Sequence, residues 1–524
     1  MVSIAELTWP LGIGFGTAGL RARMQAGFAR LNSLTIIQTS QGLAEHLLKT
    51  YPGATVKGIV IGYDARHNSK KFAQLAAAAF VAKGIKVLWY EDLVHTPMVP
   101  YGVRNLGAVA GVMVTASHNP AQDNGYKVYG SNGCQINSPE DAAIAASILR
   151  NLEPVTWDVR QLQSSPLLRP VLPLMKGEYL QDVCDLVNEY LKASSVPDFV
   201  YTPLHGVGLQ YMTAALEQLR IGNRMTAVQQ QAQPDPDFPT VKYPNPEETG
   251  ALELAMDTAD KHGVCLVLSN DPDADRFAVA EKVGDKWQQF TGDQVGVLLA
   301  YYLFSHMPPH EVRNCTMLNS AVSSQMLAEI AAKEGFQFLE TLTGFKWLGN
   351  TALTLGKTGK TVTFAYEEAL GYMTPNVVHD KDGITAAILF LCAVTQWGSP
   401  WKKLLHLYEK YGYFYTLNTY WRSPEVTTTK KLFGRIQKLG SPFPVTVGGR
   451  QVLRWRDLSQ NYDSATPDNI PELPSPRDSQ MITCWLEGGT LDHGIRFTIR
   501  ASGTEPKIKS MKQPGLLMPA RDLD

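Results

Sequence analysis

The chain has 524 residues, of which 44% are hydrophobic and 19% are charged, and its formal net charge is −1. This composition is typical of a folded protein and excludes a disordered one, and the balanced charge gives no sign of the basic excess of a nucleic-acid-binding protein, so we expect no nucleic-acid partner. A single core stops growing near ~250–300 residues, so several domains are expected.

The N-terminus, the cysteines and the apolar runs indicate a cytoplasmic protein without a membrane partner. The first residues lack a basic leader and include Glu6, which disfavours a signal peptide. Six scattered cysteines form no C-x-x-C pair, which argues against a zinc site and against a disulfide framework. The longest apolar stretch, Ile384–Val394, is shorter than the ~18 residues of a membrane span and predicts a buried helix.

Short apolar runs that end in polar loops predict buried strands. They lie at Gly58–Tyr63, Val109–Val114, Val264–Leu268 and Thr361–Ala365. Helix-like segments, Lys71–Lys83 and Ser323–Lys333, stop at or near a glycine. This alternation indicates α/β layers, in which ligands bind outside the carboxyl ends of the strands. From about Tyr411 the pattern becomes strand-like and predicts a separate C-terminal domain.

The first polar loop reads TASHNP and is followed by DNGYK, residues 115–120 and 123–127. A serine directly after a buried strand is expected to be exposed, and Ser117 is therefore a candidate nucleophile. His118 and Lys127 are candidates to move protons or to hold phosphate oxygens. The same residue types also form ordinary polar turns, and this motif alone favours neither interpretation.

The second loop, DPDADR, places Asp271, Asp273 and Asp275 at alternate positions directly after a predicted strand. Unpaired carboxylates at this density repel one another, and a hard cation such as Mg²⁺ relieves the repulsion. An aspartyl nucleophile, as in some phosphatases, is one alternative, and a solvated acidic turn is another. A calcium loop fits less well because the glycine and the final glutamate of the EF-hand pattern are missing.

Two further loops offer groups for a phosphorylated sugar. The loop YEEALGY, residues 366–372, and the following DKDG, residues 380–383, supply carboxylates that can accept hydrogen bonds from hydroxyls, although such a cluster is more often a helix N-terminus. The segment RASGTEPKIK, residues 500–509, combines basic and hydroxyl side chains around a glycine and predicts a phosphate-binding loop. A basic surface turn is the alternative.

These motifs, together with FGTAGLR at residues 15–21, occur in an order that resembles the α-D-phosphohexomutase superfamily. The segments FGTAGLR, DNGYKVY, TLTGFKW and EEALGYM are most similar to those of its phosphopentomutase/phosphoglucomutase-2 branch. The resemblance covers about Phe15 to Lys509. It implies an α/β fold, with three related α/β domains with mixed sheets and a smaller α+β C-terminal domain around a central cleft. The expected boundaries are 1–160 for a phosphoserine-bearing domain, 161–285 for a metal-binding domain, 286–408 for a sugar-binding domain and 409–524 for a phosphate-binding domain.

The resemblance also implies a role for individual residues. Ser117 is expected to be the phosphoserine, and a phosphoserine oxygen would share a Mg²⁺ ion with Asp271, Asp273 and Asp275. The groups expected to stabilise the transferred phosphoryl group or to move protons are Arg21, Arg276, His118 and Lys127. The groups expected to bind the sugar are Thr343, Glu367 and Lys381. The groups expected to bind the phosphate that does not react are Arg500, Ser502, Gly503 and Thr504.

The expected activity is the interconversion of sugar 1-phosphates and end-carbon phosphates, of ribose, deoxyribose or glucose, by a monomer primed with a sugar bisphosphate. Two features depart from the family pattern. Ala369 stands where some relatives have a serine, and only residues 510–524 follow the phosphate-binding loop, so we expect an incomplete last domain. The alternatives are a glucose-1,6-bisphosphate synthase, a phosphomannomutase, and a catalytically weak phosphosugar-binding variant.

Overall fold

The computed structural model describes residues 19–188, 191, 195–422, 426–475, 480–488, 494–501 and 507–516. The chain divides into two compact units. Unit 1 comprises Met1–His306 and Gly344–Trp401, and unit 2 comprises Met307–Thr343 and Lys402–Asp524. The N-terminal motif residues Phe15–Ala18 and the predicted phosphate-binding residues Ser502, Gly503 and Thr504 lie outside the described residues.

The first sheet of unit 1 has six strands in the order β1-β5-β4-β2-β3-β6. The strands are β1 Leu20–Arg23, β2 Ile59–Tyr63, β3 Val87–Trp89, β4 Ala110–Val114, β5 Asp123–Gly130 and β6 Leu168–Pro170. Successive residues of β2 face opposite sides: Ile59 and Ile61 belong to the core beneath α4, whereas a Cβ atom on Gly62 would meet Val99 of α5. The sheet is therefore covered by helices on both faces, which explains its continuous apolar strands.

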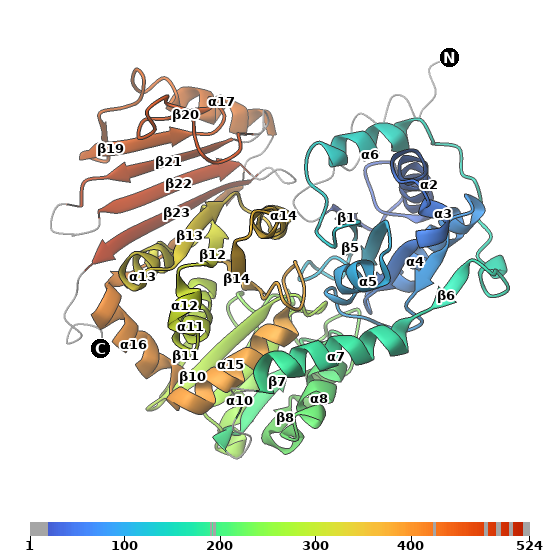
Figure 1. Cartoon of the computed structure of the whole chain (residues 1–524), viewed down its shortest axis with the longest axis horizontal. Coiled ribbons are helices and arrows are strands. Elements are labelled where there is room, and N and C mark those ends of the chain that lie inside the picture. The colour runs from blue at the N-terminus through green and yellow to red at the C-terminus, as the bar shows by residue number, and fades with distance from the viewer. Residues whose placement is uncertain are drawn as a thin grey trace. The chain divides into compact units, whose positions relative to one another are not determined.

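The helices around this sheet are α2 Ser33–Thr50, α3 Ala54–Lys57, α4 Ser69–Ala82, α5 Met98–Leu106 and α6 Glu140–Leu149. Asn32 caps α2 by accepting a hydrogen bond from the Thr35 amide, and the Thr35 hydroxyl in turn accepts one from the Asn32 amide, which satisfies two donors that a helix start leaves open. Figure 1 shows α2 and α4 side by side, in agreement with their contacts.

The second sheet of unit 1 has five strands in the order β11-β10-β9-β7-β8. They are β7 Phe199–Thr202, β8 Met225–Ala227, β9 Leu266–Asn270, β10 Phe277–Val283 and β11 Lys286–Gln289. The neighbouring helices are α7 Leu172–Asn188, α8 Leu209–Gln218, α9 Gln229–Ala232, α10 Glu253–His262, α11 Gly292–Ser305 and α15 Gly383–Trp397, whereas α14 Phe345–Lys357 contacts β14. The last strands of this unit, β14 Thr361–Glu367 and β15 Gly371–Met373, pair antiparallel.

Unit 2 begins with α12 Pro309–Val312, β12 Cys315–Ser320, α13 Met326–Glu334 and β13 Gln337–Thr341, and β12 pairs with β13 in parallel. Helix α16, Pro400–Tyr411, leads into it from unit 1. Its larger sheet runs β16-β23-β22-β21-β19-β18, with β17 on β23 and β20 on β19. Its elements are β16 Tyr413–Phe414, β17 Leu417–Arg422, α17 Val426–Ile436, β18 Thr446–Val447, β19 Arg450–Asp457, β20 Tyr462–Asp463, β21 Met481–Leu486, β22 Ile495–Ala501 and β23 Lys507–Leu516.

The structure confirms the α/β layers, the four strands and the buried helix that the sequence predicts, with shifted ends. The predicted helix Ser323–Lys333 begins only at Met326, because Ser323 belongs to a turn in which its hydroxyl lies 2.9 Å from that of Ser320. Helix α15 is buried over most of its length, as expected of Ile384–Val394. No single helix in the described part of the chain is both long and apolar enough to cross a membrane.

Candidate active site

The predicted nucleophile lies in a turn that follows β4 directly. Ser117 has a φ of 52°, a left-handed conformation that non-glycine residues rarely adopt and that is found mainly where surrounding contacts impose it. Its Oγ donates a hydrogen bond of 2.6 Å to Asp271 Oδ2 and lies 3.2 Å from His118 Nδ1. The expectation of an exposed serine is wrong: Ser117 is only 2% exposed, because these partners cover its hydroxyl.

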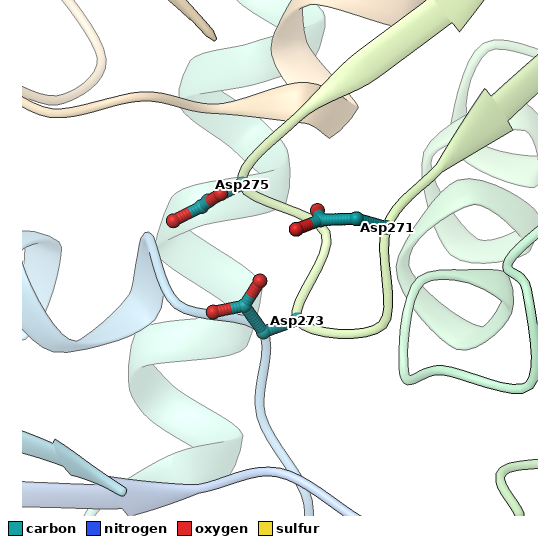
Figure 2. Close-up of side chains that lie close together, drawn as sticks. All are labelled: Asp271, Asp273 and Asp275. Atoms are coloured by element: carbon teal, nitrogen blue, oxygen red, sulfur yellow. The ribbon is translucent and has the colours of Figure 1, made fainter. Parts of the chain in front are cut away.

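The acidic loop connects β9 to β10 and carries three carboxylates that face one space, as Figure 2 shows. Ligand atoms of Asp271, Asp273 and Asp275 all lie within 4.8 Å of one another, and all three residues are buried. Within this tight loop Ala274, between Asp273 and Asp275, has a positive φ of 50°. The predicted acidic cluster therefore exists as a convergent set of oxygen ligands.

Lys127 of β5 neutralises part of this charge. Its Nζ lies 2.8 Å from Asp273 Oδ2 and 2.7 Å from Asp275 Oδ2. Burial alone would lower the pKa of Lys127, but the two carboxylates outweigh it and raise that pKa. The same contact holds the pKa of Asp273 below its usual range despite burial. Lys127 is thus a firmly held ammonium, which suits charge neutralisation better than proton abstraction.

Asp271 has the opposite electrostatic environment. Burial, together with the charges of Asp273 and Asp275, raises the pKa of Asp271 well above its usual range. A divalent cation on the three carboxylates would reverse this effect because it would compensate their charge. Lys381 adds a second ammonium, with its Nζ 3.2 Å from Asp275 Oδ2 and 5.1 Å from the centre of the Phe345 ring.

Two arginines, Arg21 and Arg276, contact residues around the nucleophile. Arg21 of β1 pairs in register with Gly125 of β5 and donates a hydrogen bond of 3.0 Å from Nη1 to Asn119 Oδ1. The Arg276 amide donates to Asp271 Oδ1 at 3.0 Å, and its Nη1 lies 3.9 Å from Glu247 Oε2. Arg21 of β1 and Arg276, the residue before β10, therefore both place positive charge near the acidic loop.

His118 is surrounded by positive charge. Burial lowers the pKa of His118 well below its usual range, and Arg276 and Arg21 lower it further. The imidazole is therefore neutral near pH 7. A neutral imidazole with Nδ1 beside the Ser117 hydroxyl has the form that a proton acceptor requires.

The remaining predicted residues fall into two groups. In unit 1, Glu367 at the end of β14 accepts a hydrogen bond of 2.8 Å from the Gly344 amide. In unit 2, Arg500 of β22 donates one of 2.9 Å to the Thr343 hydroxyl. The structure thus brings one predicted sugar residue, Thr343, into contact with one predicted phosphate residue, Arg500, within unit 2.

The sequence analysis assigns no role to four residues that lie near Ser117 in the structure: Asp64, Arg66, Thr96 and Thr115. The Thr96 hydroxyl donates to Asp273 Oδ2 at 2.6 Å. Asp64 follows β2, which is one of the strands that the sequence predicts, so its position at the carboxyl end of a strand could have marked it as a candidate site residue. Thr96 follows no predicted strand, and its partner lies 177 positions away.

The residues of the acidic loop fit a hard divalent cation. Among the described residues, none donates a hydrogen bond to Asp273 Oδ1 or Asp275 Oδ1, although both atoms are buried. A buried carboxylate oxygen without a partner is costly, and oxygen-only coordination is what Mg²⁺ prefers. Asp271, Asp273 and Asp275 are therefore the residues that would hold such an ion.

Comparison with known proteins gives consistent matches over most of the chain. Models of phosphoglucomutase/phosphomannomutase α/β/α domains I, II and III match residues 12–154, 177–284 and 291–411. The phosphoribomutase of Saccharomyces cerevisiae is 45% identical, over 95% of this chain and 85% of that protein. The glucose 1,6-bisphosphate synthase of Homo sapiens is 40% identical, over 94% and 82%. The solved open form of pp63/parafusin, a phosphoglucomutase from Paramecium, shares the fold with a TM-score of 0.68 and 18% identity, over 97% of this chain and 91% of that one.

Proposed function

The chain belongs to the phosphoglucomutase/phosphomannomutase family, and from this premise we propose that it is a phosphosugar mutase that carries the transferred phosphate on Ser117. The observation that carries the proposal is the hydrogen bond of 2.6 Å from Ser117 Oγ to Asp271 Oδ2. It places the nucleophile at the edge of the acidic loop, so that a phosphate on Ser117 would share that loop's cation.

In the first half of the cycle, a sugar hydroxyl attacks the phosphorus of phospho-Ser117. The new bond joins the sugar oxygen to phosphorus, the bond from phosphorus to Ser117 Oγ breaks, the sugar hydroxyl loses its proton, and Ser117 Oγ gains one. His118 Nδ1 lies 3.2 Å from Ser117 Oγ, so His118 is the group placed to give Ser117 Oγ that proton as it leaves and to take it back in the second half. The product is a sugar bisphosphate and unmodified Ser117.

In the second half, the bisphosphate presents its other phosphate to Ser117. That phosphoryl group moves to Ser117 Oγ, and the proton returns to the sugar oxygen that is released. The sugar must turn around between the two halves. We propose that Glu367 and Lys381 bind its hydroxyls, and that Arg500, Thr343 and the loop residues Ser502, Gly503 and Thr504 bind the phosphate that is not being transferred.

Charge stabilisation dominates phosphoryl transfer, because the protein contributes mainly positioning and neutralisation. Arg21 and Arg276 provide positive charge beside Ser117, and the Lys127 ammonium offsets part of the negative charge of Asp273 and Asp275. We propose Mg²⁺ as the ion held by the three aspartates and a sugar bisphosphate as the primer. The ion, when bound, would neutralise phosphate oxygens as a Lewis acid.

We propose pentose phosphates, with ribose 1-phosphate converted to ribose 5-phosphate, as the preferred substrate pair. The similarity to a phosphoribomutase at 45% identity supports this preference, and glucose 1-phosphate is the second substrate to test. A bisphosphate synthase is the alternative, supported by the relative at 40% identity. The free thiols of Cys134, Cys184, Cys392 and Cys484 support a cytoplasmic location. The monomeric state and the four-domain boundaries stay predictions.

A coupled assay tests this function directly. Purified protein is given ribose 1-phosphate or glucose 1-phosphate in parallel, with Mg²⁺ and a trace of glucose 1,6-bisphosphate. We expect turnover of both with a higher kcat/KM for the pentose, and none by Ser117→Ala. A folded protein that makes bisphosphate from an acyl phosphate donor but does not isomerise either sugar would support the synthase instead.

A further inference from the structure

The turn that carries Ser117 contains backbone carbonyl oxygens that need hydrogen-bond donors from outside the turn. Residues 115–123 leave the sheet after β4 and return to it at β5, and Ser117 holds a left-handed φ within them. The amides of Asn119, Asp123 and Met24 donate to the carbonyl oxygens of Ala116, Pro120 and Gln122. No described backbone amide donates to the carbonyl oxygens of Ser117 and Asn119, and buried carbonyl groups without partners are unfavourable, so another group must satisfy them.

Arg66, just after β2, provides that group. Its guanidinium donates to four carbonyl oxygens of this turn, those of Ser117, Asn119, Pro120 and Asp123. Nη2 donates to the carbonyl oxygens of Ser117 and Asn119, the latter at 2.5 Å. Nη1 donates to those of Pro120 at 2.9 Å and Asp123 at 3.3 Å. The residue is only 4% exposed.

The guanidinium is itself held from two sides. Arg66 Nε lies 3.5 Å from Asp64 Oδ2, and the ring centre of Phe238 lies 4.9 Å from Arg66 Cζ. Asp64 also accepts a hydrogen bond of 2.6 Å from the Thr115 hydroxyl, whose oxygen accepts the Ser117 amide at 2.9 Å. The turn is therefore fixed through its carbonyl groups by Arg66 and through its amide by Thr115.

This arrangement separates Arg66 from the arginines that would contact phosphate. The two Nη atoms carry four N–H donors, and the four carbonyl oxygens take one each. Arg66 cannot bind a phosphate without releasing the turn. A lysine could not replace it, because an ammonium is a point charge with three donors and lacks the planar fork that spans four oxygens.

We propose that Arg66 is a positioning residue for the phosphate-carrying serine: it holds the left-handed turn that directs Ser117 Oγ toward Asp271, and Phe238 and Asp64 keep its guanidinium in place. This inference rests on the proposed role of Ser117 as the phosphate carrier. Misplacing a reacting atom by about 1 Å can lower a rate about 100-fold. Arg66 therefore acts on the rate of phosphate transfer and leaves the affinity for the sugar nearly unchanged.

The test is the rate at which Ser117 is phosphorylated by glucose 1,6-bisphosphate with Mg²⁺, followed by rapid quenching and mass spectrometry. For Arg66→Lys we expect this rate and kcat to fall roughly 100-fold per folded molecule, with KM changed less than about threefold. The control is Arg456→Lys, which replaces a buried guanidinium that pairs with Glu340 in unit 2. It is expected to lower stability but to keep the phosphorylation rate.

Two further variants cover the case in which Arg66→Lys does not fold. Guanidinium ion added to Arg66→Ala should restore the phosphorylation rate at least tenfold, and Phe238→Leu, which keeps an apolar contact, should lower that rate several-fold. If the rates per folded molecule match the wild type while only the melting temperature falls, Arg66 is merely structural and the inference is wrong. If the wild type itself acquires no phosphate on Ser117, the proposed function fails and the result does not depend on Arg66.

Discussion

The Ser117 hydroxyl donates a hydrogen bond to Asp271 across 154 positions of the chain. The two residues follow interior strands of different sheets, β4 of the first and β9 of the second. Their contact joins the candidate phosphate carrier to the candidate metal ligands within unit 1. The predictions below test separate parts of this arrangement.

Replacing Asp275 by asparagine should weaken Mg²⁺ binding while preserving shape. The substitution removes one of the three charges, and changes around a metal site typically cost 10–100-fold in metal affinity. We expect the Mg²⁺ concentration for half-maximal activity to rise at least tenfold. Asp260→Asn is the control, because Asp260 pairs with Lys282 near the surface. An unchanged Mg²⁺ dependence of the Asp275 variant would remove the acidic loop from the metal site.

Lys127→Met should destabilise the protein in a way that depends on divalent cations. Without the ammonium, Asp273 and Asp275 lose their buried counter-charge, and breaking a buried ion pair costs about 3–5 kcal/mol. We expect a large drop in the free energy of unfolding with EDTA and a smaller drop with saturating Mg²⁺, both measured by urea denaturation. Equal losses in the two conditions would show that Lys127 and the ion do not share these carboxylates.

Gly206→Ala should displace the backbone of the acidic loop at Pro272. A Cβ atom at this position would lie 2.2 Å from Pro272 Cα, and backbone cannot yield as a flexible side chain can. Overpacking of this kind costs about 1–3 kcal/mol, and we expect weaker Mg²⁺ binding as well. Gly177→Ala is the matched control: it lies in α7 with no atom within 4 Å of the added Cβ, and it should be neutral or stabilising. Equal effects of the two variants would contradict this account.

His379 should make stability depend on pH. Burial, and then the nearby Arg104, lower the pKa of His379 to about 4, below its usual value of about 6.5. Between about pH 6.5 and about pH 4, His379 is therefore protonated in the unfolded chain but neutral in the folded chain. The free energy of unfolding falls as pH drops through this range. His379→Gln should flatten this fall by on the order of 2 kcal/mol, as measured by denaturation between pH 4 and 7. A wild-type slope that persists unchanged in the variant would mean that His379 does not contribute.

The sequence predicts the parts of this protein that depend on local pattern. Apolar runs predict the strands β2, β4, β9 and β14. The alternate aspartates of DPDADR predict a convergent set of carboxylates. The run at Val264–Leu268 was displaced from β9 by two residues, because Val264 still closes α10 by bonding to the Ala259 carbonyl, whereas Asn270 pairs with Phe277.

Contacts between distant segments could not be predicted in the same way. The sequence motif places Lys127 near Ser117, but nothing local indicates that the partners of Lys127 are Asp273 and Asp275, 146 and 148 positions away. Arg66 was missed because its partners are backbone carbonyl groups, which carry no residue signature. The burial of Ser117 was missed because it depends on the second sheet, whose acidic loop covers the hydroxyl.

The central claim is that Ser117 carries the phosphate, and the most direct measurement is the location of that phosphate. The protein is incubated with glucose 1,6-bisphosphate and Mg²⁺, quenched, digested and mapped by mass spectrometry, and a second sample is chased with ribose 5-phosphate. We predict one phosphate on Ser117 that the chase removes. A phosphate on Asp271, or none on a folded protein, would contradict the account.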